Sequence, residues 1–399
     1  GAGKATESTL WDYVGWVIDR NLYLDPRGTF QTQRQVKLRL DQIYITLNAT
    51  VMEDLEGPDK DLDIPPDSTN PQQRSMLQLP SLPSGRRGPA GESRPWNQLI
   101  GDHPQMVVLG DPGGGKSTLL RHLALVHARA LADPDSTGLD DLLGGRARLP
   151  ILVRIADYAE SEAWRGRSLT DFLSNYHQIA DCPAVGLADL FTQWLRSGQC
   201  LLLLDGLDEI TTTEDRAGVV SRVEDFTRRH AKAGNRFVVT SRVADYRTAP
   251  LTGDFTHFRA MDMNREQIEG FLRRWCTAVE DSQAPDASEQ YRRTTAEAEV
   301  TGILRAVDTS PGVSRLAVNP LMLRILALIH STGAQLPQKR VELYKLAADT
   351  LTRTWRRANG VPESMLAEDR HVTRLLGVLA DWIHTNRPTG TAHRDEVLK

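Results

Sequence analysis

This sequence contains few cysteines and no long apolar run. The 399 residues include only three cysteines, Cys182, Cys200 and Cys276, which are far apart and odd in number. This pattern excludes a disulfide framework and favours free thiols in a reducing compartment, so we expect a cytoplasmic protein. No stretch of about 18 apolar residues is present, and the N-terminus lacks the apolar core of a signal peptide, so we expect no membrane span.

An excess of charge and a metal-binding cluster are also absent. The net charge is −4 with 25% charged residues, which carries no overall signature of nucleic-acid binding. No group of cysteines and histidines in the sequence has the spacing of a metal-binding site. The hydrophobic content of 40% is ordinary for a globular protein, and this length predicts about two to four domains.

The first 52 residues are predicted to form a small α/β module. Apolar residues recur at helical spacing over residues 8–24 and alternate over 36–47, which predicts a helix and then a strand. Residues 1–4 are expected to be a remnant of cloning. The module carries no catalytic signature, so we interpret it as a structural appendage. Residues 53–95 are rich in Pro, Gly, Ser and Asp and are predicted to be a flexible linker.

From residue 96 onward, strand and helix patterns alternate, which is typical of a doubly wound α/β fold. Short apolar runs predict strands buried on both faces of a parallel sheet, at 106–109, 150–155, 200–204 and 236–240. Helices are predicted between them at 117–132, 168–178, 187–197 and 214–232. Beyond residue 262 only helices are predicted, at 264–276, 288–307, 320–332, 338–358 and 369–385. We therefore predict an α/β domain over 96–261 and an all-α domain over 262–336.

A glycine-rich motif follows the first of these strands. It matches G-x-x-x-x-G-K-[ST] at every fixed position, and an amphipathic helix begins directly after it. Glycines allow a tight loop whose N–H groups point at phosphates, and a helix N-terminus favours anions. Lys116 is expected to reach the β- and γ-phosphates and Ser117 to bind Mg²⁺. The predicted nucleotide-binding residues are Gly110, Asp111, Pro112, Gly113, Gly114, Gly115, Lys116, Ser117 and Thr118.

A second motif consists of the apolar run 201–204 and the acids that follow it. Such a strand delivers Asp205 to the carboxyl edge of the sheet, where ligands bind in open α/β folds. We predict that Asp205 is the second Mg²⁺ partner, although a loop acid after a core strand is the alternative. Glu209 is the predicted general base for the attacking water, and Asp208 is its main rival.

A third strand ends in Thr240-Ser241-Arg242. A fixed positive charge at this edge can sense whether a γ-phosphate is present, so we assign that role to Arg242. The alternative is a surface arginine that pairs with Asp245 or another acid. Arg154, at the end of another predicted strand, is a second candidate for the sensing role.

Together these motifs resemble the NACHT family of signal-transduction NTPases, which includes the NOD-like receptors. The doubled acids Asp208 and Glu209 are the most diagnostic part. The resemblance implies that Pro320, at the first position of a predicted helix, packs near the adenine, while simple helix initiation is the alternative. It also implies that residues 337–399 begin a winged-helix domain, expected to be truncated. In relatives this domain supplies a histidine to the β-phosphate of ADP, and His384 and His393 are candidates.

The resemblance implies an ATP/ADP-binding molecular switch with slow ATP hydrolysis and Mg²⁺ as the metal. Nucleotide exchange would control oligomerisation in immune-type or regulatory signalling, such as antiphage defence in a bacterium. A P-loop kinase or metabolic ATPase is one alternative, but it would need an arginine-rich lid. A winged-helix DNA-binding regulator is another, but the arginines of 370–399 are balanced by acids, so we expect no nucleic-acid partner.

Overall fold

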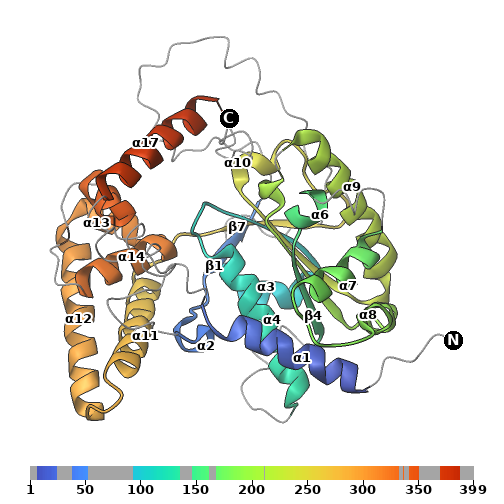
Figure 1. Ribbon diagram of the computed structural model, residues 1–399, viewed down its shortest axis with the longest axis horizontal. Helices are drawn as coiled ribbons and strands as arrows, with labels where there is room; N and C mark the ends of the chain where they lie inside the picture. Colours follow the sequence, from blue (N-terminus) through green and yellow to red (C-terminus); the bar gives the residue numbers. More distant parts are fainter. Residues whose placement is uncertain are drawn as a thin grey trace.

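The structure of this chain is a computed structural model with an α/β body and an all-helical lobe beside it (Figure 1). It describes residues 7–24, 38–52, 93–134, 146–160, 168–210, 212–331, 336, 341–349 and 369–386. The strands are β1 (Asn48–Val51), β2 (Arg94–Pro95), β3 (Gln105–Leu109), β4 (Leu149–Arg154), β5 (Cys200–Asp205), β6 (Arg236–Ser241) and β7 (Thr256–Ala260).

The helices of the α/β body are α1 (Glu7–Leu22), α2 (Leu40–Ile43), α3 (Trp96–Asp102), α4 (Lys116–Ala132), α6 (Ala156–Glu160), α7 (Leu169–Ile179), α8 (Leu187–Arg196), α9 (Thr213–His230) and α10 (Val243–Tyr246). Short 3₁₀ helices occur at Leu207–Glu209 and Ala231–Ala233. The helical lobe contains α11 (Arg265–Gln283), α12 (Glu289–Thr309), α13 (Pro311–Ala317), α14 (Pro320–Ser331) and α17 (Asp369–Asn386). None of these described helices is both long and apolar enough to cross a lipid bilayer.

The described strands form one mixed sheet in the order β2-β1-β7-β3-β6-β5-β4. The five strands from β7 to β4 are parallel, whereas β1 runs antiparallel to both of its neighbours. Leu201–Leu204 of β5 are at most 1% exposed, which agrees with a continuous apolar run buried on both faces of a parallel sheet. The predicted fold class, a P-loop α/β sheet followed by a helical region, is therefore confirmed.

The strand predicted over 36–47 is wrong. Residues 40–43 form the short helix α2, residues 44–47 have no regular structure, and β1 begins only at Asn48. Leu40 and Ile43 are 1% and 3% exposed. Their spacing of three places both side chains on one side of a helical turn, whereas residues three apart in a regular strand face opposite sides. The apolar pattern thus reflects burial of this segment in the core, not alternation on a pleated sheet.

The N-terminal segment is built into the α/β body. Helix α1 packs against α4, and β1 pairs with β7. Tyr13 of α1 is completely buried and donates a hydrogen bond to the carbonyl oxygen of Pro150 at 2.8 Å. The described residues of this segment therefore pack into the same hydrophobic core as the sheet.

Two predicted regions fall largely outside the described residues. Of the predicted linker 53–95, the structure describes only 93–95, where Arg94 and Pro95 form β2 against β1. Within the predicted winged-helix region, 341–349 and α17 are helical, in agreement with the expected helices. The rest of that region lies outside the described residues, His393 included.

Candidate nucleotide-binding site

The glycine-rich loop lies between the end of β3 and the first turn of α4. Gly113 and Gly115 have φ angles of 76° and 86°, in the left-handed region that favours glycine. A Cβ atom on Gly113 would also lie 2.7 Å from Cβ of Leu321, in the helical lobe. The loop conformation and its contact with the lobe therefore both require glycine at this position.

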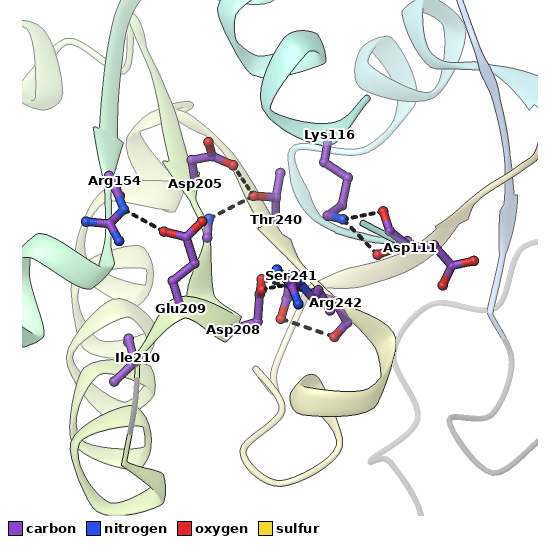
Figure 2. A network of polar contacts seen from close by, with 12 residues as sticks. Asp111, Lys116, Arg154, Asp205, Asp208, Glu209, Ile210, Thr240, Ser241 and Arg242 are labelled. Atoms are coloured by element: carbon purple, nitrogen blue, oxygen red, sulfur yellow. Dashed lines mark hydrogen bonds and ion pairs between the residues drawn. The ribbon is translucent and has the colours of Figure 1, made fainter. Parts of the chain in front are cut away.

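Lys116 lies inside the curve of this loop. Its Nζ donates hydrogen bonds to the carbonyl oxygens of Gly110, at 2.7 Å, and Asp111, at 3.0 Å (Figure 2). Burial lowers the pKa of Lys116, and the negative charge of Asp208 opposes that effect. The contact of this ammonium group with phosphate oxygens stays a prediction.

Thr240 orients the carboxylate predicted to hold the metal. The β5–β6 register pairs Leu204 with Val239, which brings Asp205 beside Thr240. Thr240 Oγ1 donates to Asp205 Oδ1 at 2.6 Å and accepts a hydrogen bond from the N–H of Gly206 at 3.0 Å. Sequence reasoning gave Thr240 no role of its own, because its hydroxyl acts only through a neighbouring strand.

The donor set for a metal consists of Ser117 in the first turn of α4 and Asp205 at the end of β5. Mg²⁺ keeps several waters and binds one or two carboxylates together with substrate phosphates. A hydroxyl and a carboxylate that is oriented by a hydrogen bond therefore fit Mg²⁺. The metal role of both residues stays a prediction.

Asp208 and Arg242 form a closely paired unit. Asp208 is 4% exposed, and its Oδ2 lies 3.0 Å from Nε of Arg242. Its other oxygen, Oδ1, accepts a hydrogen bond at 3.0 Å from the backbone N–H of the same arginine. Both carboxylate oxygens are thus engaged, which makes Asp208 a poor candidate for a base. Arg242 pairs with an acid of the second motif, and its sensing role stays a prediction.

Glu209 is the more accessible acid, with a side chain that is 41% exposed. Its Oε2 accepts a hydrogen bond from Arg154 Nε at 2.5 Å. Arg154 Nη1 also donates to Asp157 Oδ1 at 2.6 Å. Figure 2 shows the Glu209 carboxylate directed toward Arg154. Arg154, the second candidate for a phosphate sensor, is therefore placed beside the candidate base.

A cavity of about 240 Å³ opens beside the glycine-rich loop. Residues 113–119 line one side, and Pro320, Leu321 and Arg324 of α14 line another. The remaining wall is mostly apolar and comes largely from the N-terminal segment, with the residues Leu24, Leu40, Ile43, Tyr44, Ile45 and Leu47. An apolar cavity that adjoins a phosphate site suits a nucleotide base.

Sequence reasoning missed this N-terminal wall, because no motif marks it. Tyr44 stacks on the buried ring of His122 from α4, with ring centroids 3.6 Å apart and planes 9° apart. From α11, Arg274 donates to the carbonyl oxygen of Tyr44 at 2.6 Å, and Gln267 donates to that of Thr46 at 2.9 Å. The wall is therefore held by both the phosphate-site helix and the helical lobe.

The first turn of α14 contacts the glycine-rich loop directly. Asn319 Oδ1 caps this helix, accepting hydrogen bonds from the N–H groups of Leu321 and Met322, at 3.0 and 3.2 Å. Asn319 Nδ2 donates to the carbonyl oxygen of Pro112 at 3.1 Å, and the N–H of Leu321 also donates to that of Gly113 at 3.2 Å.

Two residues implied by the family resemblance differ in where they lie. Pro320 lines the cavity, in agreement with the expected contact to adenine, which stays a prediction. His384 is exposed on α17 and does not line the cavity.

Comparison with known proteins supports a nucleotide-binding site in this part of the chain. The family model of the NACHT domain matches residues 104–279. The chain is also 24% identical over 184 residues to an uncharacterized WD repeat-containing protein from Nostoc sp.. That match covers 41% of this chain but only 11% of the length of the relative. The family match and the complete phosphate motif at the end of β3 identify residues 104–279 as a NACHT domain of the P-loop NTPase type.

Proposed function

We propose that this chain is an ATP/ADP-binding switch that acts in the cytoplasm and hydrolyses ATP slowly. Nucleotide exchange would control its self-association in immune-type or regulatory signalling. One observation carries the proposal: Asn319, which caps α14, and Leu321 in its first turn donate hydrogen bonds to the carbonyl oxygens of Pro112 and Gly113. A helical lobe bonded to the phosphate loop responds to the nucleotide that the loop holds.

The site residues divide the work of hydrolysis among them. A water oxygen bonds to the γ-phosphorus, the bond from that phosphorus to the β–γ bridging oxygen breaks, and ADP and phosphate leave. Glu209 accepts one proton of the water. Lys116 and Arg242 supply positive charge next to the phosphates. Ser117 and Asp205 would hold Mg²⁺, which when bound would supply positive charge to the phosphate oxygens.

The nucleotides are distinguished by their affinity for two arrangements of the lobe. ADP stabilises the closed arrangement, in which α14 contacts the phosphate loop. ATP favours an open arrangement that exposes surfaces for self-association. A nucleotide biases this equilibrium only by the difference between its two affinities, and a tenfold difference corresponds to about 1.4 kcal/mol.

Nucleotide content after purification tests the proposal. We expect the parent protein to release ADP on heat denaturation, detected by anion-exchange chromatography of the supernatant. Lys116→Ala should be empty yet folded, because each charge-assisted hydrogen bond to phosphate contributes about 1.5–3 kcal/mol. Lys232→Ala, at an exposed position away from the site, is the matched control and should retain ADP. A guanine nucleotide in the parent, or ADP in Lys116→Ala, would contradict the proposal.

A further inference from the structure

Arg154 lies next to Glu209, the acid proposed as the base. It ends β4 and is paired in register with Asp205 of β5. Its Nε donates to Glu209 Oε2 at 2.5 Å. In Figure 2, Lys116 lies on the opposite side of Asp205 from this ion pair. One oxygen of the Glu209 carboxylate is therefore engaged by Arg154, on the side away from Lys116.

The backbone is shaped to accept Glu209 in this position. Gly206 has a φ angle of 76°, and a Cβ atom built on it would lie 2.9 Å from Cδ of Glu209. The Glu209 side chain thus folds back over a residue that has no side chain. Glycine at this position leaves the room that the withdrawn carboxylate occupies.

Arg154 is itself fixed by a second acid. Its Nη1 donates to Asp157 Oδ1 at 2.6 Å, so one guanidinium group bridges two carboxylates. Burial opposes the charge on Arg154, but the hydrogen bonds and charges of Glu209 and Asp157 outweigh burial and raise its pKa. The guanidinium stays cationic at every pH at which hydrolysis would be measured.

We propose that Arg154 is a positioning residue that holds Glu209 away from the attacking water and so keeps ATP hydrolysis slow. This inference rests on the proposed function, in particular on Glu209 as the base. It assigns Arg154 a regulatory role in place of phosphate sensing, because its guanidinium already bridges two carboxylates. Release of Glu209 from Arg154 would then be part of the activated state.

The ion pair between Arg154 and Glu209, which we call the latch, has to open before Glu209 can act on water. Its exposure to solvent allows it to open. The side chains of Arg154 and Glu209 are 46% and 41% exposed, so water and salt screen their attraction. An exposed ion pair of this kind shifts the equilibrium between bound and released Glu209 only modestly. Removing it should raise the rate of hydrolysis about 3- to 10-fold without a change in the fold.

Single-turnover hydrolysis at saturating ATP and Mg²⁺ tests the latch in the full chain. Arg154→Gln should hydrolyse ATP about 3- to 10-fold faster than the parent, with the Kd for ATP unchanged within about twofold. Arg154→Lys keeps the charge but loses the forked donor geometry, so an intermediate rate is expected. The double variant Arg154→Gln/Glu209→Gln should be as slow as Glu209→Gln alone, because the gain depends on a free carboxylate.

Arg273→Gln is the matched control, because Arg273 also bridges two carboxylates, Glu269 and Glu297, at 48% exposure in the helical lobe. Its rate should equal that of the parent. A rate for Arg154→Gln at or below the parental rate, with ATP binding intact, overturns the latch and leaves the switch standing. Should Arg154→Gln fail to fold, a parental or lower rate for Arg154→Lys overturns it equally. Failure of the parent protein to bind ADP and ATP would instead contradict the proposed function.

Discussion

At the scale of single residues, the polar groups of the site come in pairs across neighbouring strand ends. Thr240 of β6 orients Asp205 of β5, the backbone and side chain of Arg242 hold Asp208, and Arg154 of β4 holds Glu209. Parallel strands bring their carboxyl ends to one edge, so residues that are 34 to 55 apart in sequence meet there. The orientation and availability of each carboxylate therefore depend on its partner as well as on its own position.

The bond from Thr240 to Asp205 should control the affinity for the metal. Thr240→Val removes the hydroxyl that donates to Asp205 and leaves the N–H of Gly206 without its acceptor. We expect a higher Mg²⁺ concentration at half-maximal hydrolysis and a loss of about 1–3 kcal/mol in the free energy of unfolding. Thr240→Ser keeps the hydroxyl and should behave like the parent. An unchanged Mg²⁺ titration for Thr240→Val would show that Asp205 does not depend on this bond.

The two acids of the second motif should respond differently to neutralisation. Glu209→Gln keeps the volume but accepts no proton, so turnover should fall about 10²–10⁴-fold while ATP still binds. Asp208→Asn instead removes the buried partner of Arg242, so we expect lower thermal stability and weaker preference between ATP and ADP. Single-turnover hydrolysis and thermal melting of both variants measure these effects. Parental turnover in Glu209→Gln, with none in a stable Asp208→Asn, would make Asp208 the base.

At the scale of elements, the contact between α14 and the phosphate loop should slow the release of ADP. Asn319→Ser keeps a capping oxygen but loses the amide that donates to Pro112. A lost hydrogen bond of about 1 kcal/mol predicts roughly fivefold faster ADP release, measured by stopped-flow displacement of a fluorescent ADP. Asn264→Ser changes the equivalent cap of α11, whose side-chain bond stays within that lobe, and serves as the control. Equal release rates in the two variants would rule out a specific role for the α14 contact.

The elements that could be predicted from sequence are those with a local pattern. The apolar runs of β3, β4, β5 and β6 predict buried parallel strands, and each lies within a residue or two of its expected place. Strand β7, with the sequence THFRA, alternates polar and apolar residues and was not predicted. Its place beside β3 depends on a pairing between distant residues, which a single sequence does not display.

The same distinction applies to the candidate site. The glycine-rich loop is a contiguous motif, so its residues could be predicted individually. The cavity wall of residues 40–47 and the partner of Glu209 depend on how distant segments pack. Alternating apolar residues predicted a strand where the structure has α2, because burial on an irregular surface produces the same spacing. Arg154 and Glu209 meet because β4 and β5 are neighbours in the sheet. The composition of the sequence does not reveal that order.

At the scale of the whole molecule, three parts of the chain surround one cavity. The phosphate loop, the N-terminal segment and the first turn of α14 all line it. Helix α11 bonds to the N-terminal wall, and the start of α14 bonds to the phosphate loop, so the lobe is attached at more than one point. Figure 1 shows this helical lobe beside α2 and the α/β body. In the proposed switch, a change at the phosphates would reach the lobe through these contacts.

Hydrogen–deuterium exchange of the Glu209→Gln variant, loaded with ADP or with ATP and Mg²⁺, tests the central claim most directly. This variant should hold ATP long enough to measure, since it lacks the predicted base. The switch predicts slow exchange across residues 320–331 with ADP, because the N–H of Leu321 then donates to Gly113 and the first turn stays docked. With ATP the same residues should exchange faster while β3 and β5 stay protected. Identical exchange of 320–331 in the two nucleotide states would contradict the account.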